Sequence, residues 1–261
     1  MGGMCFRCRR DYSSVKIELS MASHLYNSSF GKVIWFVRRF GIFELFLKPI
    51  RYIFAPFIIP RLDKSKFTFD DRLISLFYHA YNMTWANERS VEIPIILDFM
   101  SHYESKSVLE IGNVLSHYGD VNHTILDKYE RGNGIINEDI LDFVATEKFE
   151  LIVSISTFEH FGFDDDMDGD SGVKILNAID ASLKLLALNG RLVLTVPLGY
   201  NPSLDQLITD NKLKCNRSFF ICRIGPLKWE TTTIEKALAY RYGRPFPYAN
   251  AIMIAEFGGA S

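Results

Sequence analysis

Short apolar runs in the second half of the chain end in residues suited to binding a nucleoside. The residues at or just after these run ends are Glu110, Gly112, Asn113, Asp127, Asp139 and Ile140. A glycine lets the backbone approach a ligand closely, and a carboxylate at a strand end can accept hydrogen bonds from ribose hydroxyls. Asp139 and Ile140 offer a carboxylate to an adenine amino group and an apolar side chain to its ring. In this order, the residues are typical of an adenosine-binding site.

The same positions also have a structural interpretation. Glu110 and Asp127 could be strand-end carboxylates that cap the helices following them, as in any α/β protein. For either position taken alone we favour capping. The coincidence of all the positions in one chain favours the binding site, because independent signals then agree.

The residues that follow the fourth and fifth runs, ELIVSIS and GRLVLTVP, are suited to a second substrate. Ser156 ends the fourth run and is a candidate for cofactor binding, and Glu159 and His160 follow it within four residues. An imidazole accepts a proton near neutral pH, so His160 is a candidate general base with Glu159 beside it. The alternative is that His160 caps or packs at a strand end. Tyr200 and Asn201 lie in a turn-rich segment after the fifth run and are candidates for substrate contact.

Two patterns resemble metal sites without completing one. Cys5 and Cys8 have the spacing of zinc ligands, but no second pair of Cys or His residues follows them. The acidic segment 164–170 imitates the start of a calcium loop, yet its twelfth position is Ile175, where a bidentate glutamate is needed. We therefore predict no metal site and a solvated acidic loop.

The apolar runs predict a parallel sheet that is buried on both faces, because they are short, continuous and rich in β-branched residues. They are SVLEIG (107–112), HTILD (123–127), GIINEDI (134–140), ELIVSIS (150–156) and GRLVLTVP (190–197). The segments between them are long enough for crossover helices, one of which is expected over 174–188 with a stop at Asn189 and Gly190. Further elements are expected in the flanking regions, namely helices over 70–80 and 81–100 and strands over 218–224 and 251–257.

These motifs resemble those of the class I S-adenosylmethionine-dependent methyltransferases. The resemblance is carried by VLEIG (108–112), ILDKYE (125–130), INEDI (136–140), LIVSISTFEHFG (151–162) and LALNGRLVLTVPLGYNPSLD (186–205). It implies an α/β, Rossmann-like fold, with a seven-stranded, mostly parallel sheet, an antiparallel last strand and helices on both faces. It also implies that S-adenosyl-L-methionine contacts the backbone at Gly112 and Asn113, with its ribose at Asp127 and its adenine at the next run end.

The segment NMTWANERSVE (82–92) resembles a lead-in that covers the cofactor in such enzymes, which places Thr84 and Arg89 near the methionine carboxylate. The glycine loop departs from the family pattern, because the glycine after Gly112 comes only at Gly119. A nicotinamide dehydrogenase would need glycines at 114 and 117, so that class fits less well. The departure leaves open a degenerate site in a protein that keeps the fold.

The net charge of −2 conceals a marked asymmetry, since residues 1–66 carry +8 and the remainder carries −10. A basic, aromatic-rich leader suits an anionic lipid surface better than nucleic acid. Its apolar runs are too short to span a bilayer. The spacing within 30–62 predicts an amphipathic helix that lies on a membrane surface or packs on the protein or a partner.

These features predict an N-terminal extension over 1–66 and a cofactor-binding domain over 67–261. The absence of a secretory pattern favours a cytoplasmic protein, with peripheral contact to the membrane as a further expectation. The expected function is methyl transfer to a small-molecule, lipid-linked or saccharide acceptor. The alternative is a membrane-peripheral binding or scaffold protein with a degenerate methyltransferase fold. The oligomeric state is not set by any of these features.

Overall fold

The computed structural model describes residues 42–62, 65–164 and 170–259. The chain divides into two units, Met1–Leu45 and Phe46–Ser261, and all but four of the described residues belong to the second. Cys5, Cys8, most of the predicted extension and the middle of the acidic segment therefore lie outside the described residues. The predicted domain boundary at residue 66 stays a prediction.

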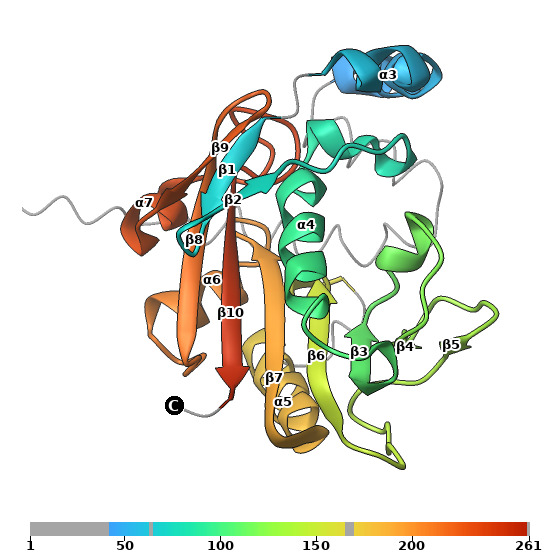
Figure 1. The fold of residues 1–261 in the computed structure, drawn as a ribbon. Coiled ribbons are helices and arrows are strands. Elements are labelled where there is room, and N and C mark those ends of the chain that lie inside the picture. Colours follow the sequence, from blue (N-terminus) through green and yellow to red (C-terminus); the bar gives the residue numbers. More distant parts are fainter. Residues whose placement is uncertain (1–41, 63–64, 165–169, 260–261) are drawn as a thin grey trace, which may run out of the picture. The chain divides into compact units, whose positions relative to one another are not determined.

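The second unit is built on one large sheet with the order β5-β4-β3-β6-β7-β10-β8-β9 (Figure 1). Its strands are β3 (Val108–Ile111), β4 (Thr124–Leu126), β5 (Ile135–Ile136), β6 (Phe149–Ile155), β7 (Leu186–Pro197), β8 (Arg217–Gly225), β9 (Lys228–Thr232) and β10 (Ala251–Gly258). The five strands from β5 to β7 are parallel, and the last strand, β10, runs antiparallel to both β7 and β8. The fold is therefore Rossmann-like, with the antiparallel last strand in place.

All five predicted apolar runs contain a strand of this sheet, and the two predicted later strands are β8 and β10. The expected count of seven is wrong by one, because β9 pairs with β8 in an antiparallel hairpin and extends the sheet. Trp229 of β9 is buried, so this hairpin shields an aromatic ring from water as well as pairing an edge. The connection from β3 to β4 holds only the short 3₁₀ helix η4 (Leu115–His117) where a crossover helix was expected.

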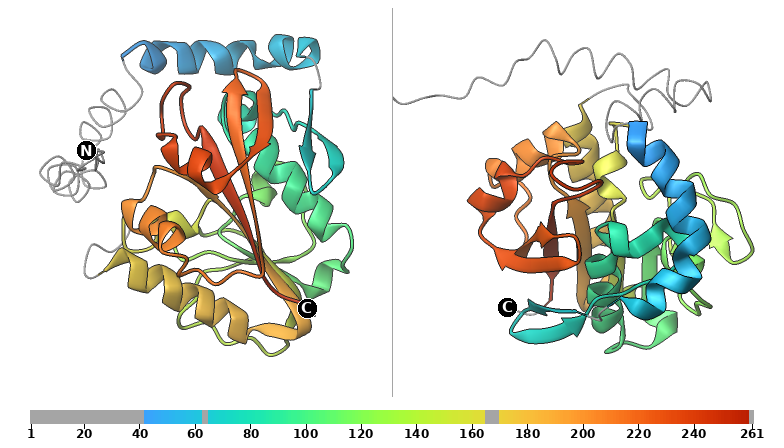
Figure 2. Two further views of the ribbon diagram at one scale, coloured as in Figure 1. Left: turned by 90° about the vertical axis from the view of Figure 1, so that its left-hand side faces the viewer. Right: turned by 90° about the horizontal axis from the view of Figure 1, so that it is seen from above.

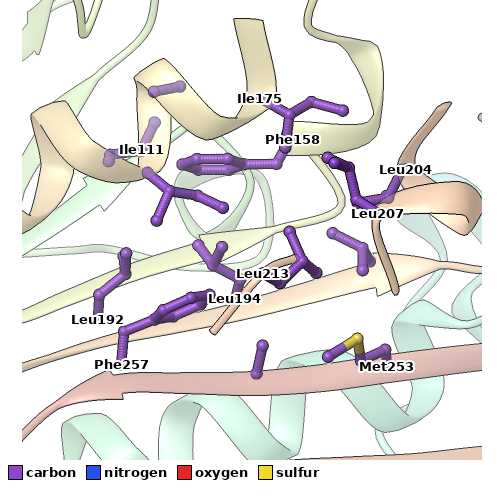
Figure 3. Close-up of a cluster of buried hydrophobic side chains, with 14 of the residues drawn as sticks. Ile111, Phe158, Ile175, Leu192, Leu194, Leu204, Leu207, Leu213, Met253 and Phe257 are labelled. Carbon is purple, nitrogen blue, oxygen red and sulfur yellow. The ribbon is translucent and has the colours of Figure 1, made fainter. Parts of the chain in front are cut away.

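Helices cover both faces of the sheet (Figure 2). One face carries α4 (Arg89–Met100), and the other carries α5 (Ser171–Lys184), α6 (Pro202–Thr209) and α7 (Ile234–Ala239). Successive strand residues alternate between the two cores, since Leu151 and Val153 face α4 while Ile152 faces α5. Figure 3 shows part of the core on the α5 face, in which Phe158 and Ile175 lie over Leu194. Burial on both faces explains why these strands read as continuous apolar runs.

The helix predicted over 70–80 is wrong, because the start of this segment forms the turn and second strand of a β-hairpin of β1 (Lys66–Phe69) and β2 (Arg72–Ser75). Asp70 and Asp71 form its two-residue turn, with φ values of 46° and 59°. Such turns need positive φ at both central residues, which aspartate tolerates better than most side chains. The second predicted helix is confirmed in part, since α4 begins at Arg89 after the 3₁₀ segment η2 (Tyr81–Ala86).

The predicted stop at Asn189 and Gly190 is also wrong, because α5 ends at Lys184 and β7 begins two residues later. Asn189 has a φ of 63° and lies where the pairing of β7 with β6 shifts register. A β-carbon on Gly190 would lie 2.8 Å from the Phe149 carbonyl oxygen. The two residues therefore make an irregularity within a strand, where the backbones approach too closely for a side chain.

The helix α3 (Ile42–Ile58) continues into η1 (Ile59–Arg61), and its residues from Phe46 onward belong to the second unit. Ala55 is fully buried in a cluster with Met83, Trp85 and Ala86 of η2. Elsewhere on α3, large apolar side chains such as Ile53 are exposed. Within the part of the chain that the structure describes, no helix is both long and apolar enough to cross a membrane.

Candidate functional site

The strand order reverses between β3 and β6, so the carboxyl ends of these two strands flank the switch point of the sheet. Open α/β sheets bind their ligands at such a point, because the loops on either side diverge there. The loops that leave the strand tips at this edge carry most of the predicted site residues, while Thr84 and Arg89 come from η2 and α4.

Asp127 joins the tip of β4 to the loop that follows β3. Its Oδ2 accepts a hydrogen bond from the backbone N–H of Asn113 at 2.9 Å. Its Oδ1 accepts from the backbone N–H groups of Tyr129 and Glu130 at 2.8 and 2.7 Å. The structure thus brings Asn113 and Asp127 together as predicted. A carboxylate offers about four acceptor positions, and three of those of Asp127 are used here.

Gly112 follows β3 with a φ of +86°, a conformation that other residues adopt only at a cost in free energy. A β-carbon built on Gly112 would collide with the side chain of Thr157, which follows β6. Gly112 therefore allows the loops after two neighbouring parallel strands to meet at the switch point.

Glu110 lies inside the protein, with no exposed surface. Its Oε1 accepts from the backbone N–H groups of Val114 and Leu115 at 3.0 and 2.9 Å. Its Oε2 is 2.7 Å from Nε2 of the buried His123, which must donate because an ionised carboxylate only accepts. Glu110 holds the loop after β3 in place, which corresponds to the structural interpretation of this residue.

Asp139 and Ile140 lie beyond β5, at the next strand end. Asp139 Oδ1 accepts from the backbone N–H of Leu141 at 3.0 Å, and its Oδ2 pairs with Lys128 Nζ at 3.1 Å. Ile140 is 5% exposed and belongs to the core on the α5 face. The carboxylate is therefore partly reachable from solvent, whereas the isoleucine serves mainly the core.

Thr84 is fully buried within η2. Its hydroxyl donates to the Phe77 carbonyl oxygen at 2.9 Å and accepts from the His79 backbone N–H at 2.7 Å. These bonds join Thr84 to Phe77 and His79 and so stabilise the segment before α4. Thr84 therefore organises this segment, where its hydroxyl acts as both donor and acceptor.

Arg89, at the start of α4, and Ser156, at the tip of β6, meet through Glu92. Arg89 Nη1 pairs with Glu92 Oε2 at 2.6 Å, and the Ser156 hydroxyl donates to Glu92 Oε1 at 2.6 Å. Burial opposes the charge of Arg89, but the carboxylates of Glu92 and Glu88 raise the pKa of the guanidinium above its ordinary value. This buried network fixes the start of α4 against the tip of β6.

A second polar cluster follows β6 and β7. His160 lies in the 3₁₀ helix η5 (Phe158–His160), and its Nδ1 is 2.5 Å from Asp164 Oδ2. The Tyr200 hydroxyl donates to the same Asp164 oxygen at 2.6 Å. The rings of His160 and Tyr200 meet edge to face, with centroids 5.2 Å apart. Residues from two different loops are thus joined through one carboxylate.

Glu159 faces His160 from the other side, with 3.6 Å between Glu159 Oε1 and His160 Nε2. Glu159 is 2% exposed, and its Oε2 has no hydrogen-bond partner among the described residues. Burial raises the pKa of Glu159 to about 7, against the opposing effect of His160. Burial also lowers the pKa of His160, but Glu159 and Asp164 outweigh it, and the net pKa is raised. Glu159 therefore titrates near neutral pH, and its ionisation favours the protonated form of His160.

Asn201 is fully buried and caps the N-terminus of α6. Its Oδ1 accepts from the backbone N–H groups of Ser203 and Leu204, and its Nδ2 donates to the Glu159 carbonyl oxygen and the Ser171 hydroxyl. The amide is fully engaged within the protein. Of the two residues expected to contact substrate, only Tyr200 has part of its side chain near the surface.

Sequence reasoning missed Glu92 and Asp164 as members of these clusters. A signal for Glu92 was its position three residues after Arg89, a spacing that allows pairing on a helix. Asp164 lies four residues after His160 but was assigned to the acidic loop. Among the residues that the structure describes, no group of three or more His, Cys, Asp or Glu side chains is arranged to hold a metal ion.

The fold and the strand-tip residues define the chain as a Rossmann-like α/β protein with polar clusters on the carboxyl side of its sheet. No protein-family model matches the chain, and no curated protein matches it. The solved structures similar to it include the N-methyltransferase NodS from Bradyrhizobium japonicum in complex with S-adenosyl-L-homocysteine. The identity is 18% and the TM-score 0.42, over 67% of this chain and 88% of NodS.

Two further solved structures similar to this chain are also named as methyltransferases. An S-adenosylmethionine-dependent methyltransferase from Clostridium acetobutylicum is 12% identical, covers 82% of this chain and 99% of its own, and gives a TM-score of 0.35. An rRNA methylase from Streptococcus thermophilus is 9% identical, covers 64% and 97%, and gives a TM-score of 0.37. At these identities and TM-scores, the activity of this chain has to be inferred from its own residues.

Proposed function

We propose that the chain is a methyltransferase that uses S-adenosyl-L-methionine. The observation that carries this proposal is the bond from the Asn113 backbone N–H to Asp127 Oδ2 at the switch point of the sheet. The bond supports a ribose-binding role for Asp127, because this carboxylate lies next to the loop that contains Gly112. The alternative of a scaffold protein that keeps the fold without the cofactor is an outcome of the test below.

The residues at these strand tips fit an adenosyl group. Among the described residues, Asp127 Oδ2 accepts only the bond from Asn113, so one acceptor position is left for a ribose hydroxyl. Asp127 and Asp139 are both partly exposed, which supports a role for the Asp139 carboxylate as acceptor from the adenine amino group. Arg89 carries a charge opposite to that of the methionine carboxylate. When bound, the cofactor supplies a methyl group on a positively charged sulfonium. Transfer of this methyl group leaves a neutral thioether.

The chemical task of the protein is then to align the acceptor with the methyl group and to exclude water. A base is needed only when the acceptor atom carries a proton that must be lost. His160 is the candidate for that base, because its side chain is 43% exposed and lies between two carboxylates. The acceptor is a small molecule in this proposal, with lipid-linked and saccharide compounds as the candidates to be tested.

Calorimetry with S-adenosyl-L-methionine and S-adenosyl-L-homocysteine tests the proposal directly. We expect both to bind the wild-type protein, and Asp127→Asn to weaken binding at least about tenfold, since one charged hydrogen bond contributes about 1.5–3 kcal/mol. The matched control is Asp142→Asn, an exposed position near the same edge, which should leave binding unchanged. A thermal melt checks that each variant is folded. Absence of heat with the folded wild-type protein would refute the methyltransferase proposal and favour the scaffold.

We further propose that the protein is cytoplasmic and contacts anionic membranes through α3. Several large apolar residues of this helix are exposed, among them Ile50 at 49%, Ile53 at 67%, Phe54 at 51% and Phe57 at 63%. An amphipathic helix with basic neighbours binds an interface through buried apolar area and attraction to anionic lipid. The basic charge of residues 1–66 supports this partner over an uncharged one.

Flotation with phosphatidylcholine vesicles, with and without phosphatidylserine, tests the membrane proposal. We expect the wild-type protein to float with the anionic vesicles and the double variant Phe54→Ser, Phe57→Ser to float much less. The control is Val144→Ser, Leu188→Ser, which removes two side chains that are 84% and 94% exposed elsewhere on the second unit. Equal flotation of all three proteins would show that α3 does not contact the membrane.

A further inference from the structure

We infer that Asp164 and Tyr200 are positioning residues that orient His160 and leave its Nε2 free to accept a proton from the acceptor. The inference rests on the proposed function for its role in catalysis, although the hydrogen-bond arrangement can be measured without it. It changes the role predicted for Tyr200, from contact with substrate to support of the base.

The geometry of the three side chains carries the inference. Asp164 Oδ2 lies 2.5 Å from His160 Nδ1 and 2.6 Å from the Tyr200 hydroxyl oxygen. One carboxylate oxygen thus receives two hydrogen bonds from different directions. Tyr200 is held in turn by edge-to-face contacts with Phe163, at 5.7 Å, and Tyr242, at 4.9 Å between ring centroids. These aromatic contacts hold the ring of Tyr200, and with it the hydroxyl oxygen, beside Asp164.

The direction of the hydrogen bonds follows from the chemistry of the groups. An ionised carboxylate has no hydrogen to donate, so both His160 Nδ1 and the Tyr200 hydroxyl must donate to Asp164. Burial and then the charge of Asp164 raise the pKa of Tyr200, so the phenol keeps its proton at neutral pH. When the imidazole is neutral, its proton is therefore on Nδ1 and its lone pair is on Nε2.

The remaining groups around His160 agree with a base at Nε2. Glu159 Oε1 lies 3.6 Å from Nε2, which is too far for a hydrogen bond but close enough to stabilise the protonated ring. Burial lowers the pKa of His160, Glu159 and Asp164 raise it, and Arg89 at the start of α4 adds a smaller lowering effect. The two carboxylates thus favour the imidazolium that forms when the base accepts a proton.

The proton balance defines the class of acceptor. The acceptor nitrogen or oxygen forms a bond to the methyl carbon, the carbon–sulfur bond breaks, and the proton of the acceptor moves to Nε2 of His160. An acceptor without such a proton, such as a tertiary amine or a thioether, would not need this arrangement. The geometry therefore points to an acceptor atom that bears a hydrogen and keeps a lone pair, as in a neutral amine or a hydroxyl group.

NMR of the imidazole nitrogens, with the full chain labelled on histidine, tests the inference. The signals of His160 are assigned by comparison with His160→Gln. In the wild-type protein we expect the neutral ring to carry its proton on Nδ1. Asp164→Asn removes the charge and should lower the pKa of His160. Tyr200→Phe removes one donor to Asp164, which strengthens the interaction of this carboxylate with the ring and should raise the pKa. The control Asp180→Asn, at an exposed position on α5, should leave it unchanged.

Opposite shifts in the two variants would support the inference, because a purely structural role of Asp164 predicts no such pattern. A neutral ring with its proton on Nε2, or an unchanged pKa in Asp164→Asn, would overturn it. If Asp164→Asn does not fold, Tyr200→Phe decides alone, with a raised pKa in support and an unchanged pKa against. Calorimetry with S-adenosyl-L-methionine on the same variants separates this result from the proposed function, since cofactor binding should persist in both.

Discussion

Replacing Glu159 with glutamine should change how the stability of the protein depends on pH. Glu159 is 2% exposed, and burial raises its pKa from 4.5 to about 7. Between these two values, the unfolded chain loses the proton of Glu159 while the folded chain keeps it. Stability therefore falls as the pH rises through this range, and the decline ends once the folded carboxyl has also ionised.

The size of the effect follows from the two pKa values. A rise from 4.5 to about 7 corresponds to about 3 kcal/mol of stability lost between acidic and mildly alkaline pH. His160 contributes in the same direction, because its raised pKa gives stability at low pH that is lost as the pH rises. A glutamine amide does not ionise, so Glu159→Gln should remove most of the fall in unfolding free energy with rising pH. Above about pH 7, the variant should therefore be more stable than the wild-type protein.

Urea unfolding followed by tryptophan fluorescence, at several pH values from about 5 to about 8, measures the difference between the two proteins. The control is Glu147→Gln, at an exposed position, which should follow the wild-type curve. The reasoning is refuted if the difference in unfolding free energy between Glu159→Gln and the wild-type protein is the same at both ends of the range. That result would mean that the folded environment does not favour the protonated carboxyl.

Three further predictions concern the stability of the fold. Gly112→Ala should lower the free energy of unfolding in urea by about 2 kcal/mol or more, because φ at this position is positive and a β-carbon would meet the Thr157 side chain. The control Gly119→Ala, at a position with open space around it, should leave this free energy nearly unchanged. Asn201→Ala should lower it by about 1–2 kcal/mol through loss of the α6 cap, measured as a shift of the urea midpoint. Ile152→Ala should cost about 2–5 kcal/mol, whereas Leu188→Ala, at a 94% exposed position, should leave the calorimetric melting temperature nearly unchanged.

The sheet was predictable because its strands are buried on both faces. A strand such as β6 needs apolar residues at almost every position, and that requirement produces a run that no loop imitates. The β1–β2 hairpin was not predicted, since its strands have four residues each and its turn uses Asp70 and Asp71 instead of Asn-Gly. Its apolar residues also fit a helical spacing, and only the pairing with another strand decides between the two.

The site was predictable at the level of position but less so at the level of role. The order of strand ends located Asp127 and His160, because parallel strands bring their carboxyl ends to one edge. The hydrogen bonds made by each side chain depend on partners that the sequence does not place. Tyr200 bonds to Asp164, 36 residues away, and the bond from Ser156 to Glu92 spans 64 residues. No local pattern encodes these pairs.

The distribution of satisfied polar groups separates the two halves of the site. On the β3–β4 side, both oxygens of Asp127 and Oε1 of Glu110 accept from backbone N–H groups, and Oε2 of Glu110 pairs with the His123 side chain. On the β6–β7 side, the described residues leave Glu159 Oε2 buried without a hydrogen-bond partner. A buried polar atom without a partner costs about 1–3 kcal/mol, so it persists where another requirement outweighs stability. Under the proposed function, the half with satisfied carboxylates holds the nucleoside, and the half with the titratable Glu159 moves a proton.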